Sequence, residues 1–119
     1  MSYTSFSSIN SLEEFSFIAG NQYSLDFIAY ERDGFTPMIL DGNQGIYWVL
    51  APYGQPDYRV VKITATQTGN NTFHVDIPSS ATSTLSGKYI QQPVIVSFLG
   101  KVYYPAQGTV LITPKISYV

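Results

Sequence analysis

Apolar and polar residues alternate over two stretches of the chain, residues 23–30 and 73–77. The apolar positions are Tyr23, Leu25, Phe27 and Ala29 in the first stretch, and Phe73, Val75 and Ile77 in the second. The polar positions between them are Ser24, Asp26, His74 and Asp76. A period of two is typical of a strand with one buried face. The pattern therefore predicts two half-buried strands.

Residues 46–50 are the run with the strongest preference for β structure, and they are apolar at consecutive positions. A strand that is apolar on both faces is expected in the middle of a sheet. Trp48 is the single tryptophan, and it shares a face with Ile46 and Leu50. We expect these three side chains in the core, where truncating Trp48 to alanine costs about 3–5 kcal/mol.

Further strands are predicted from near Glu14 and over residues 58–66, 88–97 and 102–116, and residues 79–85 form at most one helical turn. The last two long strands form an antiparallel hairpin that reverses at residues 99–101. Pro93 indicates an edge strand or a bulge, and Pro105 divides the final strand in two. About seven or eight strands, spaced by about ten residues, predict an all-β sandwich or barrel.

The chain has 119 residues, enough for one domain with its own core. Residues 1–12 are Ser-rich and lack periodicity, so we expect a flexible N-terminal arm, or one that orders on a partner, followed by one domain over residues 13–119. Charged residues are only 12%, and the net charge is −2. The chain has no basic patch for nucleic acid and no segment for a membrane. The N-terminus lacks the pattern of a secretory signal, which predicts synthesis in a cytoplasm.

Residues with catalytic chemistry are scarce. No cysteine is present, which excludes disulfides and thiolate metal sites. His74 is the single histidine, and its nearest partner on the same strand face is Asp76. We interpret the two as a surface pair. No nucleophile elbow, phosphate loop or pair of facing carboxylates appears, so we expect no catalytic, cofactor or metal site and no enzyme activity.

Tyrosine is the abundant functional residue type, with ten copies. Tyrosines are favoured in protein interfaces and also stack on sugars, although half-buried tyrosines are ordinary in sheets. Tyr53 lies in a loop rich in proline and glycine, and Tyr103 and Tyr104 precede Pro105. We predict that Tyr53, Tyr103 and Tyr104 contact a partner.

Five segments carry a family resemblance: residues 19–27, 33–34, 46–50, 85–89 and 108–112. Their turn glycines and alternating strands resemble the immunoglobulin-like N-terminal domain of phage baseplate upper proteins and related tailed-phage virion proteins. The resemblance covers about residues 15–116. It implies an immunoglobulin-like antiparallel β-sandwich that docks into a virion as an adaptor, decoration protein or anchor for a fibre or baseplate.

The same resemblance implies other virion proteins as partners and a homo-oligomer or symmetric assembly. It places the protein in the virion after synthesis in the cytoplasm of a host bacterium. No functional residues carry over, because the family pattern marks positions of the fold. A carbohydrate-binding β-sandwich module is the alternative interpretation, and a glycan array with Tyr53→Ala as the test variant separates the two.

Overall fold

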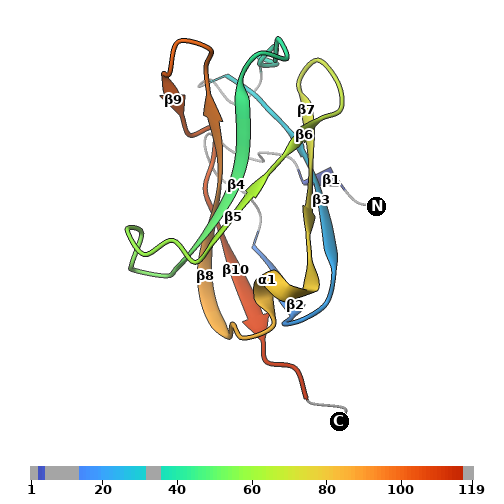
Figure 1. The fold of residues 1–119 in the computed structure, drawn as a ribbon, viewed down its shortest axis with the longest axis vertical. Coiled ribbons are helices and arrows are strands. Elements are labelled where there is room, and N and C mark those ends of the chain that lie inside the picture. The colour runs from blue at the N-terminus through green and yellow to red at the C-terminus, as the bar shows by residue number, and fades with distance from the viewer. Residues whose placement is uncertain (1–2, 5–13, 32–35, 117–119) are drawn as a thin grey trace.

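The computed structural model describes residues 3–4, 14–31 and 36–116, whose strands form two layers (Figure 1). One sheet has the order β1-β3-β7-β6, and the other has the order β2-β10-β8-β4-β5 with β9 paired to β8. The strands of the first sheet are β1 (Tyr3–Thr4), β3 (Tyr23–Ile28), β7 (Thr72–Ile77) and β6 (Thr66–Gln67). The strands of the second are β2 (Phe15–Ile18), β10 (Gly108–Thr113), β8 (Gly87–Val96), β4 (Gly45–Pro52), β5 (Val61–Thr64) and β9 (Val102–Tyr103). A short helix, α1 (Ser79–Thr82), connects β7 to β8.

This strand order is that of an immunoglobulin domain. With β1, β3, β7 and β6 as strands A, B, E and D, the first sheet has the order ABED. In the second sheet β10, β8 and β4 take the places of G, F and C, and β5 adds a fourth strand beside C. The protein is therefore an immunoglobulin-like β-sandwich, as the family resemblance implies.

Two strands pair in parallel with their neighbours, although the central pairs are antiparallel. β1 runs parallel to β3, and β2 runs parallel to β10. The described residues form ten strands where seven or eight were expected, partly because the predicted strand over residues 58–66 changes sheets. β5 pairs with β4, whereas β6, which follows after Ala65, pairs with β7. The final strand is also divided, into β9 and β10, as Pro105 predicts.

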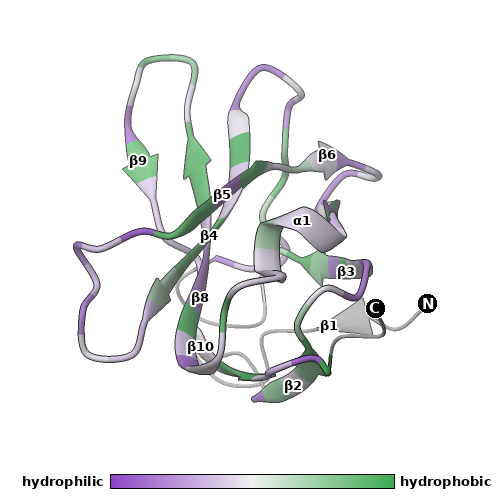
Figure 2. Cartoon of the chain, turned by 60° about the horizontal axis from the view of Figure 1, so that its bottom comes forward, coloured by the Kyte–Doolittle hydropathy of each residue, from purple (hydrophilic) through white to green (hydrophobic). Residues whose placement is uncertain are grey.

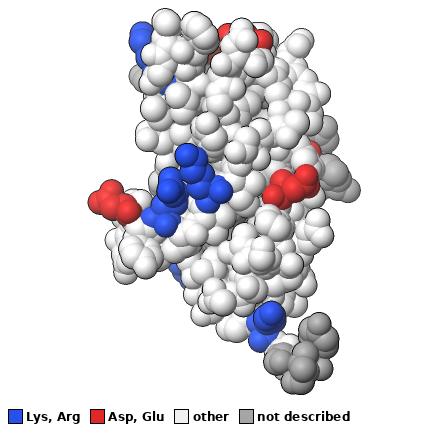
Figure 3. Space-filling view, in the orientation of Figure 1, with Lys and Arg blue, Asp and Glu red and all other residues white. Residues whose placement is uncertain are grey.

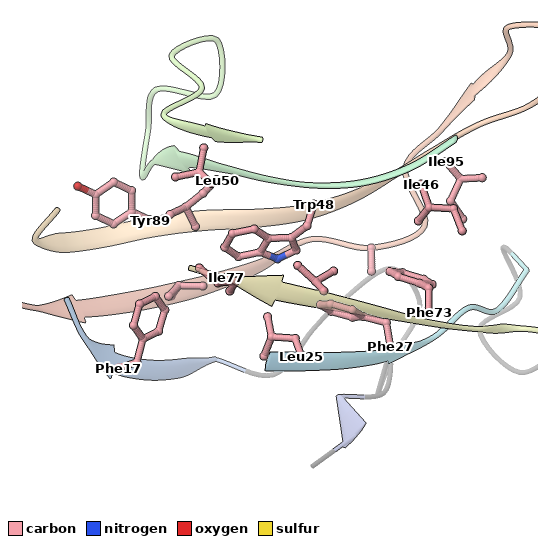
Figure 4. Packing of buried hydrophobic residues seen from close by; sticks show 14 of the residues in the cluster. Phe17, Leu25, Phe27, Ile46, Trp48, Leu50, Phe73, Ile77, Tyr89 and Ile95 are labelled. Atoms are coloured by element: carbon pink, nitrogen blue, oxygen red, sulfur yellow. The ribbon is translucent and has the colours of Figure 1, made fainter. Parts of the chain in front are cut away.

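The core lies between the two sheets and is filled by the inward positions of the alternating strands (Figure 4). The predicted trio of Ile46, Trp48 and Leu50 is buried, and the Trp48 indole lies in the middle of the cluster. Opposite it, β3 contributes Leu25 and Phe27, whose ring stacks on Phe73 of β7 at 5.1 Å between centroids. The two-residue period of these strands therefore predicts the core correctly.

Pro93 lies in a central strand, so its prediction as an edge residue is wrong. β8 is flanked by β4 on one side and by β10 and β9 on the other. The Tyr53 N–H donates to the Lys88 carbonyl, so even-numbered residues of β8 bond to the β4 side and Pro93 faces the other side. There β8 pairs with β10 only as far as Gln91, and its pairing with β9 begins at Ile95. Pro93 has no N–H to donate, and it thus lies opposite the gap between β9 and β10 that contains Pro105.

The predicted arm over residues 1–12 lies mostly outside the described residues. Only Tyr3 and Thr4 are described, and they pair with Asp26 and Phe27 of β3. The flexibility of the arm stays a prediction, as does its ordering on a partner.

Candidate functional site

The second sheet has an apolar outer face as well as an apolar inner face. In β4 the core residues Ile46, Trp48 and Leu50 alternate with half-buried Tyr47 and Val49 on the solvent side. In β8 the solvent side carries Ile90, Gln92, Val94 and Val96. Antiparallel sheets commonly alternate between a buried apolar face and a solvated polar one. This outer face departs from that rule over its two central strands.

The outer face is hollowed into a groove of about 340 Å³. Its lining is mainly apolar, and it includes Val102 of β9 and Tyr104, which follows β9. We call it the β4–β8 groove. Its lining residues are Tyr47, Val49, Leu50, Ala51, Pro56, Arg59, Lys62, Ile90, Gln92, Val94, Val96, Val102, Tyr104 and Gln107.

The rim of the β4–β8 groove on the β5 side is basic. Arg59 and Lys62 line it, and the described lining includes no acidic residue. The Lys62 ammonium lies 4.5 Å from the centroid of the Tyr47 ring, within range of a cation–π interaction. Figure 3 shows basic side chains gathered near the middle of the visible face, where Figure 1 places β5. The groove thus combines an apolar floor with positive charge on one side.

The three predicted tyrosines occupy different surroundings. Tyr104 is 56% exposed and lines the β4–β8 groove. Tyr103 is half-buried and packs against the core, because neighbouring residues in a strand point to opposite faces. Tyr53 is also 56% exposed, but it lies outside the groove lining, with the Lys88 ammonium 4.3 Å from its ring centroid. Their partner contacts stay predictions, and the structure brings only Tyr104 to the groove.

The hairpin between β8 and β9 carries an apolar tip that the sequence analysis did not single out. Phe98 and Leu99 are each 81% exposed. The turn is closed by the Ser97 N–H, which donates to the Lys101 carbonyl at 2.8 Å, and by Gly100 at a φ of 84°. Figure 2 shows hydrophobic colour at this end of the hairpin. Two large apolar residues at a turn, where polar residues are usual, are the sequence signal that could have revealed it.

A second hollow of about 310 Å³ lies beside this tip. It separates the hairpin from the segment before β4, which contributes Ile39, 69% exposed. The charged residues of its lining are Glu31, Asp41 and Lys101. We call Ile39, Phe98 and Leu99, with these charged neighbours, the apolar tip.

A polar cluster lies on the other sheet, on the outer face of β3 and β7. His74 Nδ1 lies 2.7 Å from Asp26 Oδ1, and His74 Nε2 lies 2.8 Å from Asp76 Oδ1. The Ser24 hydroxyl donates to the same Asp76 oxygen at 2.8 Å. The predicted pair of His74 and Asp76 is confirmed. Asp26 and Ser24 join it because antiparallel pairing sets Asp26 opposite His74 and Ser24 opposite Asp76.

The two carboxylates favour the protonated imidazole. The hydrogen bond to Asp26, and then that to Asp76, raise the pKa of His74 above its usual value, although partial burial opposes them. The hydrogen bond from Ser24, and then that from His74, lower the pKa of Asp76. An imidazolium can donate to both carboxylates, whereas a neutral ring can donate to only one. The cluster is a cross-strand ionic link, and its serine bonds to a carboxylate instead of the imidazole base that a nucleophile requires.

Residues 3–4, 14–31 and 36–116 contain no group of three histidine or acidic side chains placed to hold a metal ion. None of their helices has the length and apolar character to cross a membrane.

Comparisons with known proteins support no particular function. No family model matches the chain, and neither does any curated protein. Among solved structures, the chain is similar to CopC from Methylosinus trichosporium OB3b, with 13% identity and a TM-score of 0.39. The match covers 62% of this chain and 67% of CopC.

Proposed function

We propose that this protein is a non-enzymatic docking domain that binds a polypeptide partner in the β4–β8 groove. One observation carries the proposal: the two central strands are apolar on the side that the fold leaves open to solvent. Single exposed apolar residues are normal, whereas a contiguous and hollowed apolar face is typical of an interaction surface.

The charge of the groove defines the chemistry of the partner. Arg59 and Lys62 line one side, and no acid among the described lining residues neutralises them. A partner segment that brings carboxylates to this side and apolar side chains to Val94 and Val49 would complement both features. The occupant is therefore an apolar segment with acidic residues.

The resemblance to phage baseplate domains supports a narrower version of this proposal. In that version the protein is an adaptor, decoration protein or anchor in a tailed-phage virion, and its partners are neighbouring virion subunits. Locating the chain in a map of purified particles tests this version directly. Its absence from particles would overturn the virion role and leave the docking role to be tested separately.

Peptide binding tests the docking role. We expect a fluorescent peptide that alternates leucine with glutamate to bind the protein, and the matching peptide with lysine to bind much more weakly. Arg59→Glu combined with Lys62→Glu should reverse this preference, because the charge beside the floor changes sign. Val94→Glu should abolish binding of both peptides. Leu111→Glu is the matched control, since Leu111 is exposed on the same sheet but lies outside the groove lining.

Two outcomes would overturn the docking role. The first is equal binding of both peptides to the wild type and to all variants. The second is a set of consistent glycan-array hits that Tyr53→Ala removes, which would establish the carbohydrate-binding alternative. Tyr53→Ala should leave peptide binding unchanged if the groove is the docking site.

A further inference from the structure

The apolar tip and the β4–β8 groove have complementary chemistry and belong to the same molecule. The groove offers an apolar floor and two basic side chains, Arg59 and Lys62. The tip offers Phe98 and Leu99, each 81% exposed, beside the carboxylates of Glu31 and Asp41. We infer that the tip of one copy docks in the groove of the next, so that the chain assembles head to tail. This inference rests on the proposed docking role of the groove.

The charges agree with this occupant. The described lining of the tip hollow has two carboxylates and one ammonium, Lys101, which sum to −1. The described groove lining has two cations and no acid, which sum to +2. In Figure 3 both acidic and basic atoms lie at the upper end of the visible face, and the main basic cluster lies near its middle. A second copy therefore presents what the groove requires, namely apolar side chains accompanied by carboxylates.

The position of the tip favours contact between molecules. Phe98 and Leu99 lie on a turn beyond the last paired residues of β8 and β9, Val96 and Val102. Burying large apolar side chains stabilises a contact, and two such anchors suit a weak, reversible interface. A contact between two different surfaces of the same chain is heterologous and produces rings or filaments instead of closed dimers.

Sedimentation velocity tests the assembly. We expect the wild-type protein to grow beyond a dimer as its concentration rises from about 10 μM to about 1 mM, the range of weak interfaces. Added salt should weaken this growth, because it screens the charged pairs. The variant Phe98→Ser with Leu99→Ser should stay monomeric. Ile116→Ser is the matched control, because Ile116 is 94% exposed and lies outside both surfaces.

Mixing two variants distinguishes this arrangement from a face-to-face dimer. The tip variant Phe98→Ser with Leu99→Ser keeps its groove, and the groove variant Arg59→Glu with Lys62→Glu keeps its tip. Each should be monomeric alone. Their mixture should form a complex of one copy of each that grows no further, because the remaining tip and groove are both inactive. Circular dichroism spectra like those of the wild type confirm that both variants are folded.

Two results would overturn the inference. One is a wild-type protein that stays monomeric at every concentration. The other is a wild-type dimer together with a mixture in which no complex forms. If the wild type is monomeric but still prefers the leucine–glutamate peptide, the head-to-tail inference fails and the docking role stands. If peptide selectivity is also absent, both fail.

Discussion

The indole Nε1 of Trp48 donates a hydrogen bond of 2.8 Å to the side-chain oxygen of Gln91 in the middle of the core. Trp48 lies on β4 and Gln91 on β8, and both are fully buried. In antibody domains the tryptophan of the equivalent strand packs against a disulfide, whose second cysteine follows a tyrosine by two residues. Here Gln91 follows Tyr89 by two residues, and the chain has no cysteine. Gln91 thus stands at the position of the second cysteine, and it bonds to Trp48 of the neighbouring strand in the same sheet.

We predict that Gln91→Met destabilises the protein by about 1–3 kcal/mol, because it leaves the Trp48 N–H buried without an acceptor. The same change in a Trp48→Phe background should cost less, since no donor then needs that acceptor. Urea denaturation of the four proteins measures this double-mutant cycle. Strictly additive effects would show that the hydrogen bond contributes no coupling.

His74 should make stability depend on pH. The pKa of His74 is raised in the folded state. Its contribution to the free energy of unfolding is therefore complete below the pKa of the unfolded chain, about 6.5, and is lost as pH rises through the folded pKa. The pKa of Asp76 is lowered, so its contribution is present above its unfolded value of 3.8 and is lost as pH falls through the folded pKa. Stability from this cluster is therefore greatest between about pH 4 and pH 6.5.

Two measurements check the His74 prediction. Because His74 is the single histidine, its ring protons give one NMR titration, and we expect a midpoint above 6.5. Urea denaturation should show that the wild type loses stability between pH 6 and pH 9 relative to His74→Gln. A midpoint at or below 6.5, or parallel pH profiles for the two proteins, would contradict the ionic link.

Gly100 should be important for the geometry of the β8–β9 hairpin. Its φ of 84° lies in the left-handed region, and an added Cβ would meet no atom within 4 Å. Gly100→Ala should therefore cost about 1–2 kcal/mol through backbone strain alone. Gly100→Asn should cost less, because asparagine tolerates this conformation. Thermal unfolding compares the variants, and equal stability of Gly100→Ala and the wild type would refute this assignment of strain.

Deletion of residues 1–12 tests the predicted arm. The deletion removes β1, a strand of two residues at the end of the first sheet, so we expect the domain to stay folded. If the arm orders on a partner, the shortened protein should enter assembled particles less efficiently than the full chain. Quantitative mass spectrometry of purified particles measures this incorporation. Unchanged incorporation would refute a role for the arm in assembly.

The sequence predicts those parts of the site that depend on local pattern. The alternation in β3 and β7 predicts which side chains are buried, and it sets His74 and Asp76 on one face. It does not reveal Asp26 as the second partner of His74, because that contact depends on the register between strands separated by 48 positions. Nor does it reveal the groove, because Arg59, Val94 and Tyr104 come from distant segments of the chain and meet only when the sheet forms.

The pattern of the sequence is sufficient to predict the structural class. Short alternating strands, a central run that is apolar on both faces and the absence of cysteine together predict an all-β sandwich or barrel without disulfides. Three features appear only in the folded chain: the open outer face of β4 and β8, the central position of Pro93, and the exposed tip of Phe98 and Leu99. Burial and charge complementarity arise from contacts between distant strands, whereas the two-residue period reports only which face a side chain takes.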